Sequence, residues 1–262
     1  MFEFTDQQIG QWLGQHLWPL FRIASFMMIV PVMGTQLVPG NLRLLLALLM
    51  TIAMVPTLPE VPQIDPLSIT SMQIIIYQVL IGMALGFCVI FLFQLFVLAG
   101  QVIAMQMGLG FAAIIDPSNG ISVTALSQVY LIMVTLVFLS MNGHLVMFEL
   151  LYESFHMVPV STAGIADVTW WMVASRISWM FAGALTIALP VVTSLFIVTV
   201  SFGVMTRAAP QMNIFAIGFP LNIMFGLLVF WVSMAGILPP FTQFSEVTFE
   251  FMRTVLQAQV SP

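Results

Sequence analysis

The sequence predicts an all-α, membrane-associated protein built from long helical hairpins. Of its 262 residues, 61% are hydrophobic and only 6% are charged, a balance that a soluble globular domain of this size does not need. The apolar residues come in long continuous runs without strand-like alternation, so helices are favoured over a β-barrel. The five basic residues are all arginine and the net charge is −5, so we expect a membrane partner and no nucleic acid.

The expected helices lie between clusters of turn residues. Two of them are much longer than a membrane span. The run Ile69–Met107 has no proline and would make a helix of roughly 58 Å, nearly twice the ~30 Å of a bilayer core. We therefore expect these helices to leave the membrane, or the protein to sit in lipid in an unusual way. The expected helical ranges are 17–33 and 42–55, which would form a hairpin, then 69–107, 123–141, 144–157, 169–206, 215–238 and the amphipathic tail 241–259, with Pro239-Pro240 ending the run before the tail.

The chain is organised around the stretch Gln101–Gly120, where an apolar segment lies inside a predicted loop. Loops are normally polar, and irregular backbone at membrane depth is tolerated only where protein buries it or where it lines a cavity. We expect helical residues to resume at about Ser122, as an N-cap. We interpret the loop as a channel constriction, although a plain connection between helices is the alternative. The residues expected to form this plug are Met105, Gln106, Met107, Gly108, Leu109, Gly110, Phe111, Ile114, Ile115, Asp116 and Pro117.

Several single residues are candidates for helix packing or buried charge. Gly82 and Gly86 form a small-xxx-small pattern that lets another helix approach closely, or they reflect chance in a glycine-rich helix. Arg22 and Arg176 lie within apolar runs, so we expect them to face other subunits or a polar interior, with snorkelling to an interface as the alternative. Glutamines within the runs, among them Gln78, could bond across helices or line a wet path.

The sequence contains no catalytic constellation. None of the patterns HExxH, CxxC, GxSxG, GxGxxG or a P-loop is present, so we expect no enzymatic activity, no cofactor and no metal. Glu149, Tyr152, Glu153 and His156 share one helical face, which we interpret as a solvated face rather than a metal site. Cys88 is the only cysteine and is expected to be a small core residue.

The segment Arg207-Ala-Ala-Pro-Gln-Met-Asn-Ile-Phe-Ala-Ile-Gly-Phe-Pro-Leu-Asn222 is similar to the signature of the FliR family. The likeness extends in order over nearly the whole chain, through Arg22, the Pro39/Arg43 turn, Ala99-Gly-Gln, Gly108-Leu-Gly, Asp116-Pro and Ala188-Leu-Pro190. FliR belongs to the flagellar type III secretion export gate, and its injectisome counterparts resemble it closely. The signature residues carried over are Arg207, Pro210, Gln211, Asn213, Phe215, Gly218 and Pro220.

The resemblance implies a place in a helical hetero-oligomeric gate of the bacterial inner membrane, in the flagellar basal body. FliP-like, FliQ-like and FlhB-like subunits and exported flagellar polypeptides would be the partners. Residues 1–188 would be a FliP-like part made of helical hairpins, and 189–262 a FliQ-like hairpin with the tail. The family's central plug maps onto 106–120.

Two other classes of function were weighed against a gate subunit. A solute transporter would use helices broken at Pro190 and Pro220, but no paired carboxylate and cation in the runs marks a coupling site. An intramembrane enzyme would need a nucleophile–base pair or metal-ligand spacing, which the runs do not contain.

Overall fold

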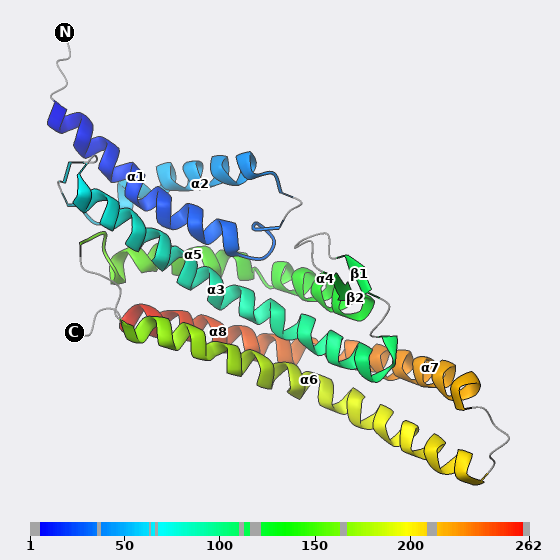
Figure 1. The fold of residues 1–262 in the computed structure, drawn as a ribbon. Helices are drawn as coiled ribbons and strands as arrows, with labels where there is room; N and C mark the ends of the chain where they lie inside the picture. The colour runs from blue at the N-terminus through cyan, green and yellow to red at the C-terminus, as the bar shows by residue number, and fades with distance from the viewer. Residues whose placement is uncertain are drawn as a thin grey trace. The chain divides into compact units, whose positions relative to one another are not determined.

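The fold is helical, as predicted, with one very small sheet. The computed structural model describes residues 6–35, 38–62, 64–65, 68–109, 113–115, 122–162, 167–208 and 214–258. Figure 1 shows the elements in chain order. They are α1 (Asp6–Ile29), α2 (Gly40–Met54), the 3-10 helix η1 (Val55–Thr57), α3 (Ile69–Gln106), β1 (Ala113–Ile115), β2 (Ser122–Thr124), α4 (Ala125–Ser140), α5 (Gly143–Met157), α6 (Asp167–Ala208), α7 (Ile214–Ala235) and α8 (Leu238–Ala258).

Both overlong helices predicted from the sequence are confirmed. Helix α3 has 38 residues and α6 has 42, which at 1.5 Å per residue are roughly 57 and 63 Å. Pro190 lies inside α6 and Pro220 inside α7, and both helices continue past them. The transporter alternative required helices broken at these prolines, so its structural premise is absent.

Proline also explains where predicted helix ends were wrong. Helix α1 ends at Ile29, two residues before Pro31, because the residue that precedes a proline is pushed towards extended geometry. The pair Pro239-Pro240, expected only to end a helix, instead lies in the first turn of α8. Proline is tolerated there because the first N–H groups of a helix have no intrahelical acceptor.

The chain divides into two compact units, each assembled from separate segments. The first comprises 1–91, 142–176 and 247–262. In it α1 packs against α2, which confirms the predicted hairpin (Figure 1). Gly82 of α3 lies directly on α1, where an added Cβ would overlap Ser25 Oγ and the backbone carbonyl of Arg22.

The second unit comprises 92–141 and 177–246, and aromatic side chains dominate its core. Phe96 of α3 is fully buried, with its ring centroid 5.8 Å from that of Phe241 and 6.3 Å from that of Phe244. Phe93 meets Phe138 of α4 edge-on at 5.2 Å. Such edge-to-face pairs add stability beyond the area they bury, so α4 and the start of α8 are fixed to α3 within this unit.

Four helices of the described chain are long and apolar enough to cross a membrane. They differ sharply in how much of each is covered by the rest of the chain. In the most apolar 18-residue stretch of α3, 61% of the residues are buried, against 17% in that of α6 and 11% in that of α7. The four spans are Gly40–Thr57, Ile69–Gln106, Thr169–Arg207 and Gly218–Ala235, and the pair α4–α5 would make a fifth if it counts as one span.

The contact of Gly82 with α1 predicts a difference between two otherwise equivalent substitutions. Gly82→Ala places a methyl group against backbone, so it should lower the free energy of unfolding by roughly 1–3 kcal/mol. Gly203→Ala in α6 meets nothing within 4 Å and should be neutral or slightly stabilising, because alanine favours helix. Tryptophan-monitored unfolding of the detergent-extracted protein measures both, and equal stability of the two variants would contradict the contact.

Candidate functional site

The end of α3 is where the predicted plug region begins. Met107 N donates to Ile103 O at 3.0 Å and Gly108 N donates to Met105 O at 3.0 Å. Gly108 then has φ +84°, a left-handed conformation that glycine adopts without penalty and that commonly terminates helices. The chain therefore leaves α3 in a direction set by Gly108.

Helix α7 holds this end of α3 from one side. Asn222 Nδ2 donates to the Gln106 carbonyl at 3.1 Å, one of the last carbonyls of α3 that lack an intrahelical donor. Met107 is fully buried and lies so close to Gly226 that a Cβ there would be 2.5 Å from Met107 Cγ. Phe219 lies against Gly108, because a Cβ added at Gly108 would be 2.7 Å from Phe219 Cε2. Spacings of three and four put Phe219, Asn222 and Gly226 on one face of α7, and we call this contact of Gln106–Gly108 with α7 the α3–α7 clasp.

Part of the segment expected to be irregular forms a short ladder instead. β1 and β2 pair antiparallel in the register Ala113↔Thr124, Ile114↔Val123 and Ile115↔Ser122, next to the start of α4 (Figure 1). The prediction of Ser122 as N-cap was therefore wrong, because Ser122 is used in the ladder. Thr124 caps α4, its side chain accepting from Ser127 N at 3.3 Å.

The predicted plug residues fall into three groups. Met105 is 70% exposed and Met107 is fully buried, while Gln106, Gly108 and Leu109 are half-buried. Ile114 and Ile115 lie in β1. Gly110, Phe111, Asp116 and Pro117 lie outside the described residues.

Arg22 is completely buried in the first unit and bonds to two other helices. Its Nε donates to Gln78 Oε1 of α3 at 2.8 Å, and Nη1 and Nη2 donate to the carbonyls of Ser154 and Val158, both at 2.8 Å. Its guanidinium also lies 4.2 Å from the Phe155 ring centroid. Burial lowers the pKa of Arg22 to about 9, which still leaves it protonated at neutral pH.

This arrangement makes Arg22 the cap of the C-terminal end of α5. The last carbonyls of a helix lack intrahelical donors and carry partial negative charge. A buried arginine supplies both hydrogen-bond donors and a positive charge to them. Arg22 was expected to face either other subunits or a polar interior. It lies among polar groups in the interior of its own chain. Gln78 likewise bonds across helices, one of the two interpretations made from the sequence.

The other two predicted arginines lie in different surroundings. Arg176 of α6 is half-buried, donates from Nη2 to Val247 O at 3.1 Å and lies 4.2 Å from the Phe251 ring centroid, so it faces α8. Arg207 is exposed in the last turn of α6, where a cation complements the negative end of the helix.

The remaining predicted positions are spread over the chain. An added Cβ at Gly86 would lie 2.9 Å from Ile29 Cβ of α1, whereas Gly218 has nothing within 4 Å. Pro220 is exposed on α7, and Phe215 lies in the first turns of the same helix. Pro210, Gln211 and Asn213 lie outside the described residues.

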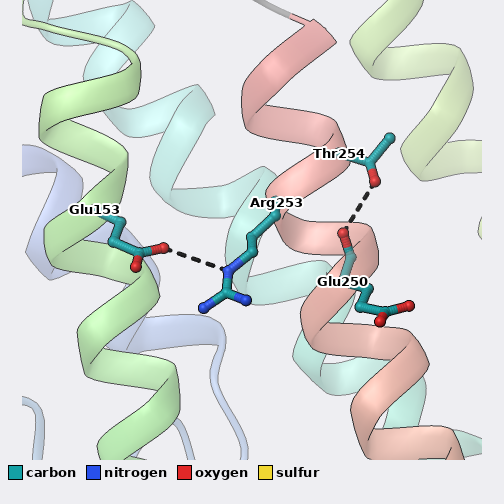
Figure 2. A network of polar contacts seen from close by, with 4 residues as sticks. All are labelled: Glu153, Glu250, Arg253 and Thr254. Carbon is teal, nitrogen blue, oxygen red and sulfur yellow. Dashed lines mark hydrogen bonds and ion pairs between the residues drawn. The ribbon is translucent and has the colours of Figure 1, made fainter.

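Arg253 of α8 forms an ion pair with another helix of the same unit. Arg253 Nε lies 3.5 Å from Glu153 Oε2 of α5, with both side chains partly exposed. Figure 2 shows the Glu250 carboxylate pointing away from Arg253, while Thr254 Oγ1 donates to the Glu250 carbonyl at 3.0 Å. Exposed ion pairs contribute only ~0–1 kcal/mol. Within the described part of the chain, no group of three or more His, Cys, Asp or Glu side chains could hold a metal.

Sequence reasoning missed three residues of the clasp, Phe219, Asn222 and Gly226. Phe219 and Asn222 lie in the quoted family-like segment but were not singled out. For Asn222 the available signal was an amide in an otherwise apolar helix, which usually marks a specific hydrogen bond. Gly226 carries no comparable signal, because its importance depends on which side chain from α3 lies against it.

The fold and these contacts define an all-α membrane protein with long apolar helices. Comparison with known proteins places it more narrowly. The model of "Bacterial export proteins, family 1" matches residues 13–247. The chain is 32% identical to the flagellar biosynthetic protein FliR of Escherichia coli (strain K12), over 100% of this chain and 98% of that protein. It is 29% identical to FliR of Bacillus subtilis (strain 168), over 90% of this chain and 92% of that protein. The chain therefore belongs to the FliR family of bacterial export proteins.

The buried network of Arg22 predicts a large stability loss on its removal. Arg22→Met keeps the volume but deprives Gln78 Oε1 and Val158 O of their donor, at ~1–3 kcal/mol each, so we expect a loss of roughly 2–6 kcal/mol in the free energy of unfolding. Arg207→Met, at an exposed position, is the control and should change it by at most ~1 kcal/mol, the usual contribution of an exposed cation at a helix end. Chemical unfolding of the extracted protein measures both, and losses of similar size would contradict the assignment.

Proposed function

We propose that this chain is a subunit of the flagellar type III protein export gate in the bacterial inner membrane. It forms part of the channel for unfolded flagellar polypeptides and supplies an apolar plug, residues 106–120, that helps keep the channel closed. The role is non-enzymatic, and other components of the apparatus supply the energy. Membership of the FliR family over nearly the full chain is the observation that carries this proposal.

The composition of the plug segment supports a sealing role. Leu109 and Phe111 lie within the segment beside two glycines, and Met105 lies directly before it. Methionine is flexible enough to adapt to a changing contour. A narrow apolar constriction excludes ions by dewetting. The exposed side chain of Met105 would be available for contacts with neighbouring subunits.

The physical logic is that of a two-state element. In the closed gate the apolar segment packs with side chains of partner subunits and excludes water. An arriving polypeptide replaces those contacts, so it favours the open state only by the difference in its interactions with the two states. The seal then re-forms when the polypeptide has passed.

The exposed apolar helices support assembly with other subunits. Spans in α6 and α7 bury few of their residues within the chain, and such surface requires lipid or protein cover. FliP-like, FliQ-like and FlhB-like subunits are the proposed partners. A two-part origin, 1–188 and 189–262, stays a prediction, since its boundary lies inside the continuous helix α6 and follows neither compact unit.

Removing the plug should make the closed gate leak. Deleting residues 110–116 in the gate assembled with its partners removes the apolar constriction, so the resting conductance to small ions should rise. The measurement is ion flux into membrane vesicles that contain the assembled gate.

Co-purification with the partner subunits is the control for assembly. Replacing Phe111, Ile114 and Ile115 by serine keeps the chain length and should also leak, because it removes the dewetting surface. If both variants assemble and stay as tight as the intact gate, the plug role is excluded.

A further inference from the structure

The α3–α7 clasp fixes the base of the proposed plug through contacts that stabilise the fold only weakly. Asn222 Nδ2 donates to Gln106 O, but Asn222 Oδ1 is buried without a partner among the described residues. A buried unpaired acceptor costs about as much as one hydrogen bond gains. The amide therefore contributes little net stability, while its directional bond sets where the last turn of α3 lies on α7.

The packing around this bond is equally specific. Met107 is fully buried over Gly226, where no larger residue fits without displacing the Met107 side chain. One residue later Gly108 adopts φ +84° and lies against Phe219 of α7. The contacts with α7 therefore include the residue at which the chain leaves the helix.

We propose that Asn222 and Gly226 are positioning residues that anchor the plug's base, with Met107 as the anchored side chain rather than part of the moving seal. This inference rests on the proposed function. The last turn of α3 stays on α7 throughout export. The point at which the chain enters the plug segment is therefore the same before and after each passage.

Loosening the anchor should make the assembled gate leak without abolishing export. Asn222→Leu removes the donor at similar volume, and Gly226→Ala pushes Met107 out of place. Both should raise resting ion flux above that of the intact gate but below that of the 110–116 deletion. Met107→Ala, which removes the anchored side chain itself, should raise the flux in the same way. Gly203→Ala, with open space around it, is the matched control.

Locking the anchor tests the second half of the proposal. A Cβ added at Gly226 would lie 2.5 Å from Met107 Cγ. Met107 Cγ is itself one carbon–carbon bond, ~1.5 Å, from Met107 Cβ. The two Cβ atoms therefore lie within ~4 Å of each other, which is within the range for a disulfide. Met107→Cys with Gly226→Cys, in a Cys88→Ala background, should therefore form a disulfide on oxidation. The oxidised gate should stay tight and still export flagellar subunits, with the Cys88→Ala single variant as control.

The outcomes separate the two proposals. If the 110–116 deletion leaves the gate tight, the plug function fails and the anchor fails with it. If the deletion leaks but the assembled Asn222→Leu and Gly226→Ala gates stay tight, only the anchor is wrong. If the oxidised cysteine pair stops export and reduction restores it, the end of α3 moves with the plug and the anchor is overturned. Should the Asn222→Leu gate fail to assemble, Gly226→Ala and Met107→Ala decide between these outcomes.

Discussion

The constraint on which the rest of the structure depends is the apolar surface that single helices leave uncovered. In the most apolar stretch of α3, 61% of the residues are buried by its own chain, whereas α6 and α7 bury less than a fifth of theirs. A monomer in water would not tolerate such surface, and helices of roughly 57 and 63 Å exceed what ordinary tilt in a bilayer absorbs. A protein with these features requires lipid or neighbouring proteins around it, which agrees with membership of a family of export proteins.

Within each unit, polar groups are used sparingly and each sets a position. Arg22 joins α1, α3 and the end of α5 by bonding the Gln78 side chain and the carbonyls of Ser154 and Val158. Gly82 allows α1 to approach α3 next to that arginine. In the second unit Asn222 bonds the last turn of α3. Among apolar helices that can slide past one another, a few directional bonds specify one register, because leaving them unmade is costly.

The helices could be predicted from the sequence because long apolar runs and proline clusters are local signals. Helix α3 was correct to within one residue, and both overlong helices were anticipated. The β1–β2 ladder was missed because three-residue strands carry almost no periodic pattern. The partner of Arg253 was missed because Glu153 lies on a distant helix, whereas the sequence shows only neighbours such as Glu250. Gly226 was missed for the same reason, since only the fold brings Met107 to it.

The central claim is that the chain completes its structure only within a hetero-oligomer. The most direct test is a mass measurement on the detergent-extracted protein, expressed alone and then with FliP-like and FliQ-like subunits. The account predicts recovery only in a large hetero-oligomer that contains this chain. A stable, monodisperse monomer or homo-oligomer obtained from the chain alone would contradict it.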